Sequence, residues 1–483
     1  DRNACQIHSH EDGKMYWTVS IPGTLSAFAC LVLQVEAYRE TFKGLEHAEH
    51  SEANAANAAM KASPDAMPVL LLWFLVFDFI FLYLSNTTYS LMRENFFKMV
   101  SYTVSIFCAL LVEMAVVEIL LEGLLRLDGM SEPHYDLAYL IFTLLLFPAW
   151  FIGISYSTWF VQDSNDSVAA AGGVIAHTAA FTGIDLSVRL QKIFVSKFDE
   201  VTDVTMSIYV ASPLLAMIVC KLFSNMSHWV RRKKLMDTVI QQKEGDGHGP
   251  FWAHEAFHGE LECAAILSGW LFRQALLTVV QQRIPTKSGE IEVPLAGPVM
   301  FLTVGGFICA KSVLAALPWK TDLTTFVQLL LGMAACWCFM SFIMYDIKQN
   351  VDLPDHRWLF LLFSVSAVAI TAMFVMGYMA DWRMLQKDQL QELIAVCGIA
   401  TGLAWEKSFA WAVKQVVKND VLRYNRHAVN LLRHGSPLLA DLTRQLKIFE
   451  VGAYLAILAV MVPAWRWYIV PLANHHEHQQ DKV

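Results

Sequence analysis

MPVLLLWFLVFDFIFLYL, residues 67–84, indicates the fold, because it is one continuous apolar stretch that carries a single charge, Asp78. A helix that crosses a bilayer needs about 20 mostly apolar residues. Comparable stretches occur at 104–125, 139–160 and 359–379. Their repetition along the chain indicates a protein that folds within a lipid bilayer.

Composition supports the same class. Of the 483 residues, 55% are apolar and only 17% are charged, whereas soluble domains average about 25% charged residues. The net charge of −8 and the lack of a long basic tract argue against nucleic acid as a partner, because phosphate binding needs clustered Lys and Arg. The one dense basic cluster, at 231–234, is expected to face lipid headgroups.

The apolar stretches predict an all-α polytopic membrane protein with about 12 transmembrane helices. The fifth and eleventh stretches are the least apolar, so we expect them to be short, tilted or partly re-entrant. The predicted spans are 17–38, 67–85, 97–125, 137–161, 168–195 and 204–224, followed by 253–281, 293–317, 323–345, 357–380, 389–418 and 448–471.

Two spacings indicate that the helices form two related halves. Arg39 follows Trp17 by 22 residues, and Arg273 follows Trp252 by 21. Likewise, Thr182-Gly183 in the fifth span is matched by Thr401-Gly402 in the eleventh. We therefore predict an internal duplication with parallel repeats. The predicted parts are a six-helix half at 1–230, a polar linker at 231–250 and a second six-helix half at 251–483.

The orientation of the termini stays open. The basic cluster at 231–234 would place both termini in the cytoplasm, but the segment 414–447 carries seven basic residues and would then lie outside. Either the fifth and eleventh spans do not cross fully, or the segment 419–445 is an amphipathic helix on the membrane surface.

Charged side chains inside the spans are the first candidates for function. Placing one at the centre of a bilayer costs about 2.5–3.5 kcal/mol on insertion scales, so such residues commonly mark ion or substrate pathways. The candidates are Asp78, Glu113, His177, Asp185, Arg189, Lys311, Glu406 and Lys407.

Two pairs stand out among these candidates. Asp185 and Arg189 are four residues apart and are expected to form an ion pair on one helix face. Asp78 and Lys311 occupy nearly equivalent positions in the second and eighth spans of the predicted repeat. A symmetric fold would bring them together between the halves, either as a pair released by protonation or ion binding or as a static packing contact.

The sequence His254-Glu255-Ala256-Phe257-His258 has the zinc-hydrolase pattern H-E-x-x-H. In that pattern two histidines one turn apart bind zinc, and the glutamate acts as general base. A third ligand is needed, and the neighbouring Glu260 and Glu262 are expected to point to other faces of the helix. We therefore expect solvated side chains at the membrane surface, with the zinc site as the alternative.

Further His and acidic residues gather at 8–11, 47–50 and 475–478, where they can capture a metal ion or simply form polar tails. The glycine pairs at 172–173 and 305–306 are expected to serve close helix packing. Neither is followed by Gly-Lys-Ser/Thr, so no phosphate loop and no cofactor are expected.

Three functions remain compatible with these residues. The leading one is a membrane transport protein, a secondary carrier or a proton or cation pathway, which uses intramembrane carboxylates and bases between two helical halves. The alternatives are a non-catalytic scaffold subunit of a larger membrane assembly and a membrane-bound zinc hydrolase centred on His254, Glu255 and His258. The expected partners are the lipid bilayer, a small ion or solute, and possible further copies or subunits. The expected location is an integral, multi-pass position in a membrane that the sequence does not identify.

Overall fold

The computed structural model describes residues 83–84, 90–119, 132–162, 164–195, 203–232, 251–281, 296–315, 322–350, 357–381, 390, 394–409 and 438–474. The chain separates into two compact units. One comprises Asp1–Phe97 and Met373–Met384, and the other comprises Lys98–Ala372 and Leu385–Val483. The second unit holds nearly all the described residues.

The described chain is helical, apart from the turn around 161–164. Every predicted segment from the third to the twelfth coincides with a helix, and the first two lie outside the described residues except at 83–84. The helices are α4 (Ser90–Glu118), α5 (Glu132–Phe160), α6 (Asn165–Val195), α7 (Asp203–Val230), α8 (Phe251–Gln281), α9 (Ala296–Ala315), α10 (Asp322–Asn350), α11 (Arg357–Asp381), a helix at 394–409, α14 (Leu438–Ala464), the π-helical turn η4 (Trp465–Ile469) and α15 (Val470–Asn474).

Within the described ranges, six helices are long and apolar enough to cross a bilayer. They are α4, α5, α6, α7, α8 and α10. The fifth predicted span, expected to be short, tilted or partly re-entrant, is the continuous 31-residue helix α6, so it is neither short nor re-entrant, and the tilt stays a prediction. At 1.5 Å per residue it is roughly 45 Å long, more than a bilayer core requires.

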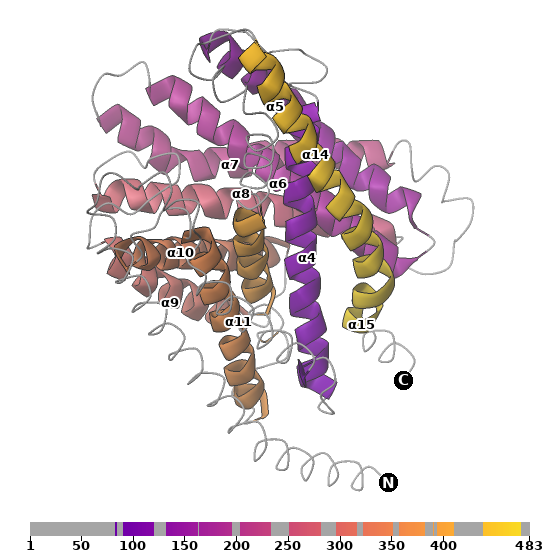
Figure 1. Ribbon diagram of the computed structural model, residues 1–483. Helices are drawn as coiled ribbons and strands as arrows, with labels where there is room; N and C mark the ends of the chain where they lie inside the picture. The colour runs from indigo at the N-terminus through magenta and orange to yellow at the C-terminus, as the bar shows by residue number, and fades with distance from the viewer. Residues whose placement is uncertain are drawn as a thin grey trace, which may run out of the picture. The chain divides into compact units, whose positions relative to one another are not determined.

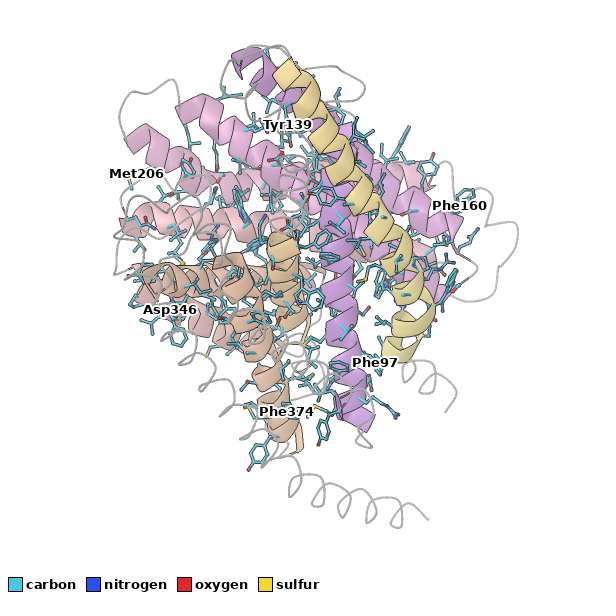
Figure 2. All side chains as sticks on the ribbon, viewed as in Figure 1. Phe97, Tyr139, Phe160, Met206, Asp346 and Phe374 are labelled. Atoms are coloured by element: carbon cyan, nitrogen blue, oxygen red, sulfur yellow. The ribbon has the colours of Figure 1, made fainter. Side chains whose placement is uncertain are left out.

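The burial of these helices fits a lipid environment. In their apolar windows, α6 is 72% buried and α8 is 67% buried, whereas α7 is only 17% buried. The outer face of α7 exposes Leu214, Ile218, Leu222 and Trp229. A contiguous apolar face of this size is unfavourable in water and is expected where a helix contacts lipid. Phe160, the last residue of α5, is likewise 80% exposed (Figure 2).

Helices α5 to α10 alternate in direction along the chain. Figure 1 shows α6, α7, α8 and α10 side by side. Consecutive helices are antiparallel: Thr158 of α5 contacts Gly172 of α6, whereas Tyr139 contacts Asp185. Helices two places apart are parallel. Contacts that show this join Gly259 to Ala176, Gly183 to Leu267, Gly269 to Ala334 and Arg273 to Ser341.

Small residues allow a close approach between α6 and α8. A Cβ added at Gly259 would lie 3.2 Å from the Cβ of Ala176 and 3.5 Å from the carbonyl oxygen of Gly172. The backbones therefore meet with almost no side chain between them. The packing role predicted for Gly172 is confirmed. The same prediction for Gly305 and Gly306 is wrong in the described part of the chain, where no atom lies within 4 Å of an added Cβ at either position.

The helix at 394–409 and η4 both pack on α4. Gly402 faces the carbonyl oxygen of Thr103, and the Trp465 indole nitrogen donates to the Ser101 hydroxyl over 3.0 Å. Thr182-Gly183 and Thr401-Gly402 thus both lie at tight helix contacts. The internal duplication that suggested their equivalence stays a prediction.

Candidate functional site

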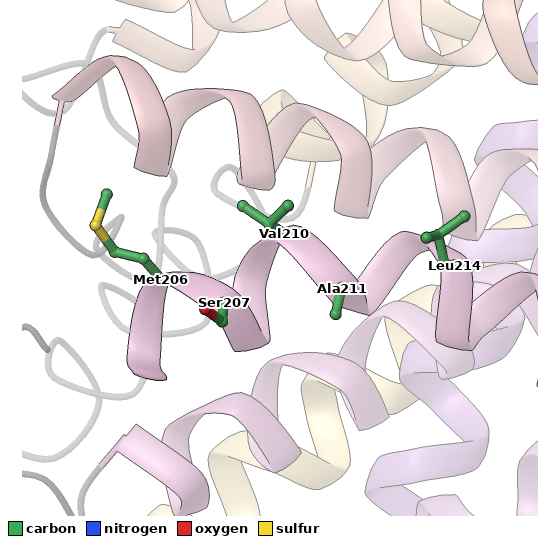
Figure 3. Close-up of a pocket in the computed structure, with 5 residues that line it drawn as sticks. All are labelled: Met206, Ser207, Val210, Ala211 and Leu214. Carbon is green, nitrogen blue, oxygen red and sulfur yellow. The ribbon is translucent and has the colours of Figure 1, made fainter. Parts of the chain in front are cut away.

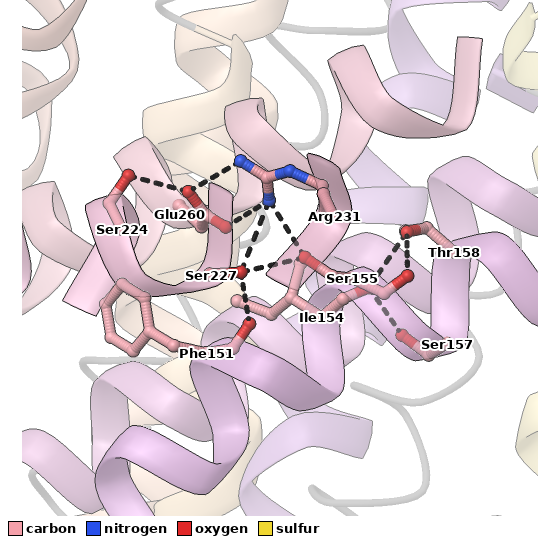
Figure 4. Close-up of polar contacts among 9 residues, drawn as sticks. All are labelled: Phe151, Ile154, Ser155, Ser157, Thr158, Ser224, Ser227, Arg231 and Glu260. Atoms are coloured by element: carbon pink, nitrogen blue, oxygen red, sulfur yellow. Dashed lines mark hydrogen bonds and ion pairs between the residues drawn. The ribbon is translucent and has the colours of Figure 1, made fainter. Parts of the chain in front are cut away.

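A buried ion pair joins α7 to α8. Arg231, the first residue after α7, donates to both carboxylate oxygens of Glu260. Arg231 is 3% exposed and Glu260 is 1% exposed. Serine hydroxyls complete the cluster (Figure 4). Ser224 donates to Glu260 over 2.7 Å, and the Arg231 guanidinium donates to Ser155 over 2.8 Å.

This cluster ties three helices together. The Ser155 and Ser227 hydroxyls lie 2.8 Å apart, and Ser227 also donates to the Phe151 carbonyl. A buried charge is tolerated when a partner and hydrogen bonds satisfy it, as both charges are here. The expectation that the whole basic cluster at 231–234 faces lipid headgroups is therefore wrong for Arg231, which points inward and donates to Glu260, Ser155 and Ser227. Arg232 is exposed.

A second group of side chains surrounds His177 in the middle of α6. His177 is 2% exposed. Its Nδ1 lies 3.1 Å from the Ser105 hydroxyl of α4. Its Nε2 has no hydrogen-bond partner in the described part of the chain, and lies 3.7 Å from the Glu262 carboxylate of α8. The other carboxylate oxygen of Glu262 lies 3.7 Å from Nδ1 of His258. We call Ser105, His177, Glu262 and His258 the histidine centre.

Of the residues in the H-E-x-x-H segment, only His258 belongs to this centre. The side chain of His254 is 74% exposed, and its Nδ1 lies 3.9 Å from the Glu255 carboxylate. His258 is 39% exposed and faces Glu262. The expectation that Glu262 points to another face of the helix is thus wrong, because positions 258 and 262 are one helical turn apart.

No described group of three His, Cys, Asp or Glu side chains is spaced to hold a metal ion. The His and acidic clusters at 8–11, 47–50 and 475–478 lie outside the described residues. So does Asp78, and the side chain of Lys311 is also outside the description. The pairing of Asp78 with Lys311 therefore stays a prediction.

A third polar group lies near the start of α5 and the end of α6. It contains Tyr139, Asp185 and Arg189, and we call it the aspartate centre. The Tyr139 hydroxyl donates to Oδ2 of Asp185. Nε of Arg189 lies 3.8 Å from the same oxygen, and the guanidinium carbon lies 3.3 Å from the centre of the Tyr139 ring. The predicted Asp185–Arg189 pair is confirmed as an i, i+4 contact. Tyr139 anchors both members.

The aspartate centre also includes residues from α4 and from the helix at 394–409. Nζ of Lys407 lies 3.1 Å from Glu406. Lys407 also interacts electrostatically with Glu113 and Asp185, and Glu113 does so with Tyr139. Five of the eight predicted pathway residues thus gather in one place: Glu113, Asp185, Arg189, Glu406 and Lys407.

The two centres are separated by two helical turns. Glu113 follows Ser105 by eight residues on α4, and Asp185 follows His177 by eight residues on α6. Each interval spans roughly 12 Å. The buried core cluster that includes Ala109, Leu110 and Phe181 occupies this interval. The Thr178 hydroxyl in the same interval is engaged with the carbonyl oxygens of Ala109 and Val174.

Several buried polar residues were not singled out from the sequence as site residues. They include Tyr139, Ser105, Ser155, Ser224 and Ser227. Arg273, used only as a marker of the repeat, is buried and donates to Ser341 of α10. Single hydroxyls are common in membrane helices, so no local pattern distinguishes these from others.

One described hollow lies away from these centres. It has a volume of about 480 Å³ and is lined by α7 residues alone, from Met206 to Leu214 (Figure 3). Val210 is 49% exposed and Leu214 is 62% exposed, so this is part of the apolar outer face of α7.

Comparison with known proteins finds no matching family, no similar curated protein and no similar solved structure.

Proposed function

We propose that the chain is a membrane transport protein, a secondary carrier or a proton or cation pathway. One observation carries the proposal: two centres of ionisable side chains lie on the same pair of helices, with an apolar layer between them. Glu113 and Asp185 belong to one centre, and Ser105 and His177 belong to the other.

This arrangement is the one that transport requires. A path that is polar throughout would leak, and a path that is apolar throughout would not admit an ion. Two polar centres separated by roughly 12 Å of packed side chains allow each centre to exchange with one side of the membrane. A change in helix packing then passes the ion between them.

The proposal includes the finer architecture expected from the sequence: about 12 spans in two related halves, with the protein passing through the membrane many times. In support, α5 to α10 alternate in direction as consecutive spans do. The packing of α6 and α7 on α8 crosses the boundary at 231–250, so the two proposed halves would share one core.

A flux assay tests the proposed function. The purified protein is reconstituted in liposomes, and H⁺, Na⁺ and K⁺ fluxes are measured against protein-free liposomes. We expect at least one flux to depend on the protein and to fall about tenfold or more in Asp185→Asn. Asp346→Asn, an exposed carboxyl of α10, is the matched control. If no ion or solute flux depends on the protein, the proposal fails.

The Arg231–Glu260 cluster favours a second candidate, a scaffold subunit of a larger membrane assembly. Its charges satisfy each other and its hydroxyls are engaged, as a structural role requires. Purification in a mild detergent that recovers stable partner proteins, together with the absence of any flux, would favour this candidate.

A further inference from the structure

The histidine centre contains a buried ring nitrogen placed to exchange a proton. Nε2 of His177 has no hydrogen-bond partner among the described residues, although a buried polar atom normally has one. It faces the Glu262 carboxylate across 3.7 Å. That separation is too long for a direct hydrogen bond, but a small side-chain rotation or one bridging water closes it.

The other ring nitrogen of His177 is held in place. Nδ1 lies 3.1 Å from the Ser105 hydroxyl, so the ring stays oriented with Nε2 toward Glu262. The imidazole and the carboxylate can then share one proton. It lies either on Nε2, facing an ionised Glu262, or on the carboxyl group, facing a bare Nε2.

His258 connects this pair to the surface. It is 39% exposed, against 11% for the Glu262 side chain and 2% for His177. Exposure therefore falls along the series from His258 through Glu262 to His177. Each member lies 3.7 Å from the next, and imidazole and carboxyl groups can both donate and accept a proton.

We propose that His258, Glu262 and His177 form a proton relay, in which His177 and Glu262 share the transported or coupled proton and His258 loads it. This rests on the proposed transport function and names its ion as H⁺. His258 takes a proton from solvent and passes the one on Nδ1 to the nearer oxygen of Glu262. The carboxyl group then turns and delivers the same proton to Nε2 of His177. His258 returns to neutral, Glu262 returns to carboxylate, and the charge resides on the His177 imidazolium.

Other titratable groups also lie beside these three residues. On α8, Glu260 is occupied by Arg231 of α7. Cys263 interacts electrostatically with Glu260, Glu262 and Cys220. From α4 the ring meets the Ser105 hydroxyl.

The first test measures proton flux in liposomes with a trapped pH dye. Glu262→Gln and His177→Gln keep the shape of the side chain approximately but remove the exchange, so we expect flux to fall at least tenfold. His254→Gln is the matched control, because it lies one turn from His258 on α8 and its side chain is 74% exposed. Its flux should equal that of the wild type. Wild-type proton flux in both Glu262→Gln and His177→Gln overturns the relay.

Chemical rescue tests the order of the relay. Imidazole added outside should restore flux to His258→Ala, whose site is open to solvent. It should not restore flux to His177→Ala, whose ring is 2% exposed. Equal rescue of both variants contradicts the assigned order.

A third measurement separates this inference from the proposed function. Infrared difference spectra across a pH titration should show a carboxyl band that is lost in Glu262→Gln and shifted in His177→Gln, whether or not flux is detected. The absence of such a band in folded protein overturns the shared proton even if the protein transports another ion. A band without any flux supports the shared proton and removes transport.

Discussion

Arg231 and Glu260 join the end of α7 to the first third of α8 through two hydrogen bonds between fully buried charges. The pair also orients the serines around it. Ser155 and Ser227 accept hydrogen bonds from Arg231, and Ser224 donates to Glu260. It is a structural contact beside the histidine centre, on the opposite side of α8 from Glu262.

We predict that removing one member of this pair destabilises the protein strongly. Arg231→Met leaves the Glu260 charge buried without its partner, at a cost of about 3–5 kcal/mol. The double variant with Glu260→Met should recover most of that loss. Arg232→Met is the control, because Arg232 is exposed, and it should change stability by less than about 0.5 kcal/mol. Unfolding in mixed detergent measures each difference. A double variant no more stable than Arg231→Met would contradict the prediction.

A second prediction concerns the close contact of the helix at 394–409 with α4. A Cβ at Gly402 would lie 2.7 Å from the carbonyl oxygen of Thr103, and a backbone atom cannot rotate away. We expect Gly402→Ala to destabilise by about 1–3 kcal/mol. Gly305→Ala, where an added Cβ meets no described atom within 4 Å, should be neutral or slightly stabilising. Thermal unfolding in detergent compares the two, and equal effects would show that the contact is absent.

The third prediction concerns Tyr139. Its hydroxyl holds Asp185, and a hydrogen bond to a charged group contributes about 1.5–3 kcal/mol. Because about 1.4 kcal/mol corresponds to a factor of ten, Tyr139→Phe should lower ion flux about tenfold to a hundredfold, while the ring remains under Arg189. Tyr156→Phe, at a 40% exposed position of the same helix, is the control. A Tyr139→Phe flux equal to that of Tyr156→Phe would remove Tyr139 from the site.

The fourth prediction concerns sidedness. His258 and Lys407 belong to different centres, and both are partly exposed. In a background with all nine native cysteines replaced, His258→Cys and Lys407→Cys should react with a membrane-impermeant thiol reagent from opposite sides of sealed vesicles. Labelling of both from the same side would contradict the proposed arrangement of the centres.

The sequence predicted helix positions well, because hydropathy reports the apolar length that a span must have. Helix ends were less predictable. Helix α4 begins at Ser90, ahead of the predicted start at 97, and α14 begins at Leu438, ahead of 448. Polar turns continue these helices beyond their apolar parts, and hydropathy does not register them.

The site was predictable only in part, for a different physical reason. The energetic cost of charge in hydrocarbon singled out Glu113, Asp185 and Lys407, which do gather. The partners of these charges depend on which helix faces meet, and a single sequence does not encode that locally. Arg231 shows the limit: it reads as one of four surface cations, and only the opposing Glu260 draws it inward.

Gly172 meets Gly259 and Gly183 meets Leu267, so α6 and α8 touch at two levels. A tilt about one of these contacts would compress or open the other. The two helices are therefore expected to move as one rigid unit, with the histidine centre beside the first contact and the aspartate centre beside the second. A change of access to either centre would then come from movement of the helices packed around this unit.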